Sequence, residues 1–229
     1  KGYNVIANGT ICIEDNPNIT ISNCLKFAQK LVDLGHEGFY LKSASGRLNP
    51  EFVYMLTSQL INRFPDQEIT IHAHSTYGEA PACYISAILA ALLNKKPITI
   101  DVQHPALSGS TAQPSMTKMA QLIKNYPDKK VNAYMPLLNN DAIKMSLDPL
   151  LTLRFKYRDY EIKYDKELLD VMYKSRVPGG ASSTLKSIPG LIDNLERKLD
   201  LQNDPNKWDI IQKHIYDVQN SILSDIGNP

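Results

Sequence analysis

The sequence predicts an α/β fold with parallel strands, and three observations lead to this prediction. Four short runs rich in β-branched residues recur about every 30 residues, the length of one strand–helix unit, and they cover residues 10–13, 38–41, 69–71 and 98–102. Helical patterns occupy the segments between these runs. The chain has 229 residues, of which 43% are hydrophobic, enough to bury a large core. Such regular alternation forms either a closed barrel or an open doubly wound sheet.

The expected helices carry start and stop signals of their own. The first follows Thr20, a possible N-cap, and stops at Gly35, because glycine often ends helices. The second has Asn49 as its cap and Pro50 at its first position, and it runs to about residue 64. The remaining two are an apolar helix over residues 82–93 and a helix opened by Pro114.

The character of the sequence changes near residue 139, and we divide the chain there into residues 1–138 and 139–229. The β pattern stops, and helical patterns continue with breaks at residues 178–180 and 189–190. The last helix has the clearest pattern, because its apolar residues recur at steps of three and four: Trp208, Ile211, Ile215, Val218 and Ile222. The second part is therefore predicted to be mainly helical.

Composition and charge exclude several classes of function. The 25 Lys and Arg residues nearly balance the 24 Asp and Glu residues and leave a net charge of +1, whereas nucleic-acid-binding domains are usually basic. The longest apolar stretch, residues 84–93, is about half of what a bilayer needs, so we expect no membrane span. Three widely spaced cysteines, Cys12, Cys24 and Cys83, indicate buried thiols in a reducing, cytoplasmic compartment.

Two histidines at the end of the third strand are the first candidates for chemistry. His72 and His74 are two residues apart, so in a strand they point to the same face. The carboxyl ends of parallel strands are where such folds bind ligands. Two imidazoles on one face form part of a site for zinc, manganese or cobalt. Either histidine could instead be a buried core residue.

Lys42, at the end of the preceding strand, is unusual because its neighbours are apolar. Its side chain could simply extend its ammonium group to water. An ammonium group has no lone pair, so an unmodified lysine would repel a cation beside two histidines. Reaction with carbon dioxide would convert the amine into a carbamate, which is an anionic oxygen ligand.

Four motifs, in order along the chain, carry a resemblance to a known family. They are Lys-Ser-Ala-Ser-Gly at 42–46, His-Ala-His-Ser-Thr-Tyr-Gly at 72–78, Ser-Gly-Ser-Thr-Ala-Gln-Pro-Ser-Met at 108–116 and Arg-Val-Pro-Gly-Gly at 176–180. The sequence resembles the biotin-dependent carboxyltransferase barrels, which include pyruvate carboxylase, the oxaloacetate decarboxylase α subunit and transcarboxylase. In this family a carbamylated lysine precedes the two histidines by 30 and 32 residues, as Lys42 precedes His72 and His74.

The resemblance implies a fold and an activity. The fold would be the second half of a (β/α)8 TIM barrel with an α-helical C-terminal extension. The protein would be an enzyme that moves a carboxyl group between carboxybiotin and pyruvate or oxaloacetate through a metal-stabilised enolate. Lys42 in its carbamylated form, His72 and His74 would be the catalytic metal ligands, with zinc, manganese or cobalt as the divalent ion.

The resemblance also implies partners and a binding loop. Biotin would arrive on a carrier domain, the N-terminal half of the barrel would have to be supplied, and the protein would be a homo-oligomer. The segment alone would be inactive. Thr111, Gln113 and Ser115 would lie near the substrate or biotin, or else form a polar loop that leads into a helix.

Several residues depart from the family pattern. Ser43 and Ala44 replace the aspartate and methionine that follow the lysine, and Ala181 replaces a glutamine after Pro-Gly-Gly. Ser75 replaces an aspartate in the histidine motif, as it does in some transcarboxylases. Loss of groups that orient metal ligands commonly costs about 10–100-fold in affinity or activity.

Two alternatives remain beside carboxyl transfer. A metal-dependent aldol-type lyase or synthase of a related barrel family would share the two histidines, but it would lack the carbamylated lysine and the Gln-Pro-Ser-Met segment at 113–116. A catalytically weakened or purely structural homologue would explain Ser43, Ala44 and Ala181.

Overall fold

The computed structural model describes residues 8–13, 19–109, 111–134 and 138–156, together with 197, 200, 201, 203–207, 209, 210 and 213. The Pro-Gly-Gly motif at 176–180, Ala181 and the apolar residues of the expected last helix lie outside the described residues. The division at residue 139 therefore stays a prediction.

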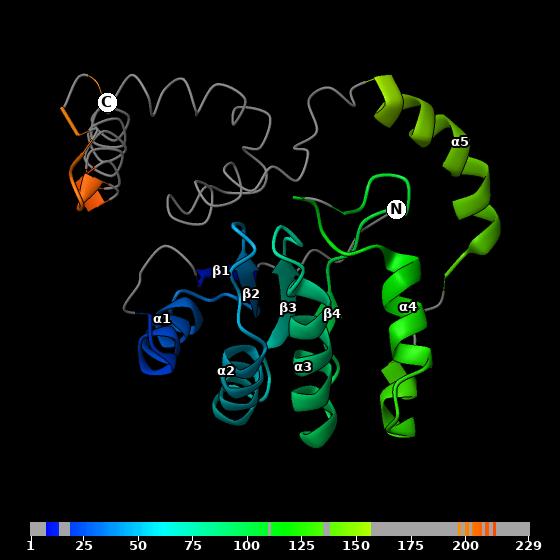
Figure 1. The fold of residues 1–229 in the computed structure, drawn as a ribbon. Helices are drawn as coiled ribbons and strands as arrows, with labels where there is room; N and C mark the ends of the chain where they lie inside the picture. The colour runs from blue at the N-terminus through cyan, green and yellow to red at the C-terminus, as the bar shows by residue number, and fades with distance from the viewer. Residues whose placement is uncertain are drawn as a thin grey trace.

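Four parallel strands form one sheet in the order β1–β2–β3–β4 (Figure 1). The strands are β1 (Asn8–Cys12), β2 (Gly38–Ser43), β3 (Glu68–Ala73) and β4 (Thr99–Ile100). The helices are α1 (Ile21–Asp33), α2 (Pro50–Arg63), α3 (Ala80–Leu93), α4 (Met116–Lys124) and α5 (Asn140–Lys156), with a 3-10 helix η1 (Lys129–Tyr134) between the last two. The prediction of an α/β fold with parallel strands and intervening helices is confirmed.

The caps of the first two helices lie where the sequence predicts them. The Thr20 hydroxyl accepts a hydrogen bond from the Asn23 amide at 3.2 Å, and Gly35 follows the helix with a φ of +86°. The side-chain oxygen of Asn49 accepts hydrogen bonds from the Glu51 and Phe52 amides. These bonds satisfy amides at a helix start that have no partner within the helix.

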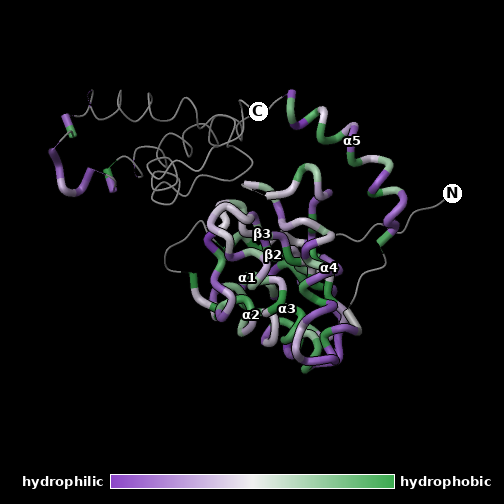
Figure 2. Tube along the Cα trace, turned by 45° about the vertical axis from the view of Figure 1, so that its right-hand side comes forward, coloured by the Kyte–Doolittle hydropathy of each residue, from purple (hydrophilic) through white to green (hydrophobic). Residues whose placement is uncertain are grey.

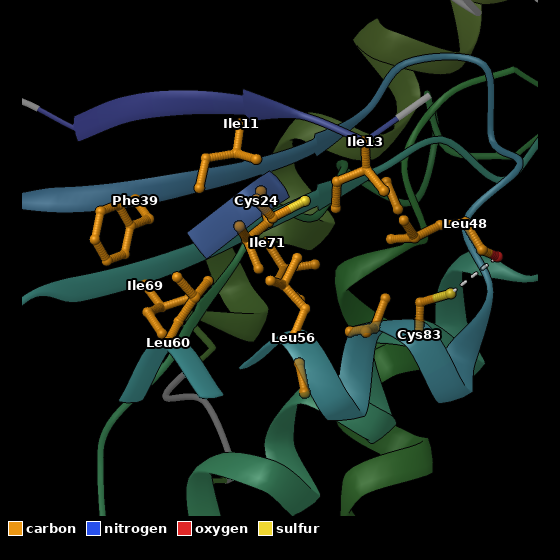
Figure 3. Close-up of a cluster of buried hydrophobic side chains, with 14 of the residues drawn as sticks. Ile11, Ile13, Cys24, Phe39, Leu48, Leu56, Leu60, Ile69, Ile71 and Cys83 are labelled. Carbon is orange, nitrogen blue, oxygen red and sulfur yellow. Dashed lines mark hydrogen bonds between the residues drawn. The ribbon is translucent and has the colours of Figure 1, made fainter. Parts of the chain in front are cut away.

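The apolar core lies between one face of the sheet and helices α1, α2 and α3 (Figure 3). Strand residues whose side chains alternate toward this face are buried, as Phe39, Leu41 and Ile71 show with exposures of 0%. The Cys83 thiol of α3 donates to the Leu48 carbonyl within the same cluster. Because side chains alternate along a strand, the opposite face of β2 carries Tyr40 and Lys42, which are only partly buried.

Helix α5 stands apart from the helices that cover the sheet (Figure 1). Hydrophilic and hydrophobic residues mix along its length (Figure 2), and none of its residues is buried. It contacts the loop after β4: Arg154 donates to the carbonyls of Ala106 and Ser108 at 3.1 Å, and the Ser146 hydroxyl lies 3.1 Å from His104 Nε2. The described part of the chain contains no helix that could cross a membrane.

Two sequence predictions need correction. Cys12 is exposed, whereas Cys24 and Cys83 are buried as expected, because Cys12 points away from the apolar face of the sheet. The fourth helix begins at Met116 and not at Pro114. The Gln103 amide donates to the Pro114 carbonyl and the Met116 amide to the Gln103 carbonyl, which holds this segment extended until Ser115.

Candidate functional site

The register of the sheet brings candidate residues from neighbouring strands into one row. Cys12 pairs with Lys42, and Lys42 pairs with His72, across the carboxyl end of the sheet. Ile71 pairs with Ile100, so the next residue after β4, Asp101, continues the row beside His72. Paired residues of a sheet point to the same face. The row therefore lies on the face opposite the apolar core.

The Nδ1 atoms of the two histidines are held by acceptors. His72 Nδ1 lies 3.0 Å from a carboxylate oxygen of Asp101 and 2.9 Å from the Tyr40 hydroxyl. His74 Nδ1 donates to the backbone carbonyl of Thr111. A carbonyl or carboxylate only accepts, so both imidazoles carry their proton on Nδ1. Each Nε2 atom therefore has a lone pair available.

The two Nε2 atoms converge on one point. The side-chain nitrogen of Gln113 lies 3.2 Å from His72 Nε2 and 3.1 Å from His74 Nε2. The two imidazole ring centroids are 5.0 Å apart. Because both Nε2 atoms are acceptors, the amide group of Gln113 faces them with its two N–H donors.

The hydrogen bonds of the two histidines are those of metal ligands, but two imidazoles alone do not complete a metal site. Metal-binding histidines usually donate their second nitrogen to a carboxylate or a backbone carbonyl, as His72 and His74 do here. No group of three His, Cys, Asp or Glu side chains that could hold a metal ion occurs among the described residues. Lys42 is paired with His72 in the sheet, so a carbamylated Lys42 is the third ligand that the sequence predicts from this part of the chain.

Burial is the main reason that the imidazole of His74 stays neutral. Burial lowers the pKa of His74 most, and electrostatic interactions with His72 and with the Lys42 ammonium lower it further. The hydrogen bond to the Thr111 carbonyl acts in the opposite direction. The influence of the Lys42 charge on His74 agrees with the placement of both side chains at the same end of the sheet. A neutral imidazole is the form that binds metal ions.

Asp101 is held by two tyrosines. The Tyr40 hydroxyl donates to the Asp101 carboxylate, and the Tyr84 hydroxyl donates to the Asp101 backbone carbonyl at 2.6 Å. Burial, the hydrogen bond to Asp101 and the negative charge of that carboxylate all raise the pKa of Tyr40. Tyr40 therefore keeps its proton and remains a donor. Tyr84 is fully buried and also accepts from the Ala73 amide at 3.0 Å, so it ties the end of β3 to β4.

The predicted loop residues take different places. Thr111 meets His74 through its backbone, and Gln113 meets both histidines through its side chain. Ser115 is buried at the start of α4, with its hydroxyl 3.0 Å from the Thr117 hydroxyl. The structure thus brings Thr111 and Gln113 to the histidines and places Ser115 at a helix start.

Sequence reasoning missed Asp101 and Tyr40 as members of the site. Asp101 follows His72 by 29 residues, nearly the spacing that relates Lys42 to His72. That spacing could have indicated it. Tyr40 lies two residues before Lys42 and therefore on the same face of β2, so the alternation of side chains along the strand could have indicated it.

No family model matches the chain. It is 25% identical over 214 residues to the methylmalonyl-CoA carboxyltransferase 5S subunit of Propionibacterium freudenreichii subsp. shermanii, covering 91% of this chain and 37% of that protein. It is 29% identical over 119 residues to mitochondrial pyruvate carboxylase of Rattus norvegicus, covering 52% of this chain and 10% of that one.

Solved structures agree on the fold. The carboxyl transferase domain of Rhizobium etli pyruvate carboxylase, solved with 3-bromopyruvate, matches 88% of this chain and 31% of its own with a TM-score of 0.65 and 20% identity. The same domain has been solved with pyruvate and biocytin, and it matches with a TM-score of 0.63 and 21% identity.

These comparisons confirm the fold class and the resemblance. The fold is that of a TIM-barrel type domain, of which the chain has parallel strands and outer helices. The similarity to biotin-dependent carboxyltransferases, inferred above from four motifs, is confirmed by the relatives. The chain spans 37% or less of the length of these relatives.

Proposed function

We propose that this chain supplies two adjacent strand ends of a biotin-dependent carboxyltransferase site, where a carboxyl group moves between carboxybiotin and pyruvate or oxaloacetate. The observation that supports this most is the pair of histidines: both Nδ1 atoms are held by acceptors while both Nε2 atoms face one point. A pair of histidines used only for packing has no need of such convergence.

In this proposal each residue has a stated role. His72, His74 and carbamylated Lys42 hold a divalent ion, with zinc, manganese or cobalt as the candidates. Asp101 and the Thr111 carbonyl orient the two imidazoles. When bound, the ion would supply Lewis-acid polarisation of the substrate carbonyl. The buried helix-facing side of the strands keeps these groups in place.

The proposed reaction exchanges one bond for another. The C–N bond of carboxybiotin breaks and releases carbon dioxide, and the methyl carbon of pyruvate gives up a proton that the ureido nitrogen takes up. The resulting enolate attacks carbon dioxide and forms the new C–C bond of oxaloacetate. Biotin would carry the carboxyl group, and a biotin carrier domain and the rest of the barrel are the partners that this proposal requires.

Metal content and oxaloacetate decarboxylation of the full-length protein test this proposal. We expect it to retain a divalent ion and to decarboxylate oxaloacetate when free biotin or its carrier domain is present. Replacing Lys42 by Ala should abolish ion retention with the fold intact, because Lys42 is a ligand and not a core residue. Lys26→Ala, at an exposed position of α1, is the matched control. Unchanged metal content in the Lys42 variant, measured by elemental analysis, would contradict the proposal.

A second candidate is a homologue that keeps the barrel for assembly without turnover. Ser43, which follows Lys42, is fully buried and brings no carboxylate to the site. The Gln113 amide satisfies both Nε2 atoms without any ion. In that case the full-length protein would hold no divalent ion and would leave oxaloacetate unchanged.

A further inference from the structure

We propose that the side chain of Gln113 closes the cation-free site and competes with the ion for the two histidines. This inference rests on the proposed function for the identity of the competitor, a divalent cation. The amide nitrogen lies 3.2 Å from His72 Nε2 and 3.1 Å from His74 Nε2. An ion bound by both histidines would need the same two lone pairs, at about 2.0–2.1 Å. The amide and the ion cannot occupy this place together.

The backbone around Gln113 is fixed, so the competition concerns its side chain alone. On one side, the Ser75 amide donates to the Ala112 carbonyl at 2.8 Å. On the other, the Gln103 amide donates to the Pro114 carbonyl at 2.8 Å. Gln113 itself is only partly buried, so its side chain has solvent into which it can withdraw. Entry of an ion therefore requires rotation of one side chain and no movement of the loop.

The amide also gives both Nε2 atoms a hydrogen-bond donor when no ion is bound. His74 is 8% exposed, and a buried acceptor without a donor is costly. Two N–H groups of one amide serve both Nε2 atoms at once. Gln113 thus stabilises the cation-free protein and lowers its apparent affinity for the ion.

The test is the affinity of the full-length protein for Zn²⁺ alone, measured by competition with a chelating dye. Gln113→Ala should bind about tenfold more tightly, because two hydrogen bonds no longer have to be broken. Gln113→Glu should bind more tightly still, since a carboxylate is itself a ligand. Gln121→Ala, at an exposed position of α4, should behave as the original protein. Equal or weaker binding by Gln113→Ala would overturn the proposal.

A second measurement decides the matter if none of these proteins binds Zn²⁺, which would refute the metal-dependent function itself. In chelator, the ¹⁵N resonances of the two unprotonated Nε2 atoms report whether they accept hydrogen bonds. Gln113→Ala should move both resonances downfield, and Gln121→Ala should move neither. Unchanged Nε2 resonances in Gln113→Ala would mean that the amide does not close the site.

Discussion

The Asp101 carboxylate is the one charged group in contact with the imidazole of His72, at 3.0 Å, among the interactions of the described residues. The carboxylate accepts a hydrogen bond from His72 Nδ1–H and another from the Tyr40 hydroxyl, and the backbone carbonyl of Asp101 accepts one from the Tyr84 hydroxyl. A carboxylate in this position fixes the tautomer and makes the free nitrogen more basic. The strength of His72 as a ligand should therefore depend on Asp101.

Asp101→Asn should lower the affinity of the full-length protein for Zn²⁺ by about 10–100-fold, because the amide keeps the geometry but loses the charge. Dye competition measures the change, and Asp66→Asn, at an exposed position, is the control. Circular dichroism should be the same for both variants. Equal affinities would show that Asp101 serves the fold and not the imidazole.

The three thiols should differ in reactivity. Burial raises the pKa of Cys24 to about 11, and burial with the nearby Glu79 charge raises that of Cys83 to about 12, while Cys12 is exposed. At pH 8 an alkylating reagent should modify Cys12 first, and the other two only after unfolding, as mass spectrometry can show. Equal rates for Cys12 and Cys24 would contradict the burial of α1 against the sheet.

The same shifts carry a sign for stability. Both buried thiols bind their protons more tightly in the fold than in the unfolded chain, where the pKa is 9.0. Their contribution to the free energy of unfolding is therefore complete below pH 9 and is lost as the pH rises from 9 toward 11 for Cys24 and toward 12 for Cys83.

Sequence reasoning reached the strand residues of the candidate site more easily than its loop residues. Lys42 and His72 lie on strands and His74 directly follows β3, so a period of two and a parallel register relate position in the sequence to position in space. Thr111 and Gln113 lie on a loop without a period. Nothing in their spacing indicates that one offers a backbone carbonyl and the other a side-chain amide.

At the scale of elements, the turn after β2 is held close to the turn after β3. Gly46 has a φ of +77°, and a Cβ atom there would lie 2.9 Å from the His74 carbonyl oxygen and 3.0 Å from the Thr76 side chain. Gly35, at the end of α1, has a φ of +86° but no atom within 4 Å of such a Cβ. A comparison of substitutions at the two glycines therefore distinguishes the cost of a left-handed backbone from the cost of a steric clash.

Gly35→Ala should cost about 1–2 kcal/mol in the free energy of unfolding, from the left-handed backbone alone. Gly46→Ala should cost more, because the His74 carbonyl must also move, and it should weaken Zn²⁺ binding where Gly35→Ala does not. Urea unfolding and dye competition measure the two effects. Similar values for both variants would mean that the two turns do not press on each other.

The elements themselves were largely predictable, with errors where tertiary contacts override local signals. The caps at Thr20 and Asn49 are local and were found from residue type and position. The fourth helix starts two residues later than Pro114 predicts, because the start of α4 depends on backbone pairing of Ser115 with Gln103, 12 residues earlier. Propensity alone contains no such information.

At the scale of the whole molecule, the edge strand β1 pairs with β2 alone among the described strands. Beside it lies a groove of about 300 Å³, lined by strand and helix residues: Thr10, Ile11, Cys12, Ile19, Asn23, Cys24 and Phe27. Phe27 is 45% exposed at this groove. An open strand edge with apolar surface favours association with other chains.

The chain expressed alone should therefore aggregate and be inactive. Phe27→Lys should reduce the aggregated fraction in size-exclusion chromatography, because a charge on α1 beside the groove makes burial of this apolar surface against another chain unfavourable. Leu93→Lys is the control, since Leu93 is 69% exposed but does not line the groove. A monomer that melts cooperatively without either substitution would contradict this prediction.

The row Cys12–Lys42–His72–Asp101 has a consequence for how such a protein can change over time. Each strand contributes one residue at the same register position of the sheet. The residues next to it along the strand point to the other face, which packs on the helices. A substitution at one of these positions changes the chemistry of the site, and the apolar core on the other face of the sheet stays unchanged. Inserting or deleting one residue inside a strand would instead exchange the two faces. Substitutions at these four positions can therefore change the site while the core stays intact, whereas the lengths of the strands that carry them must stay constant.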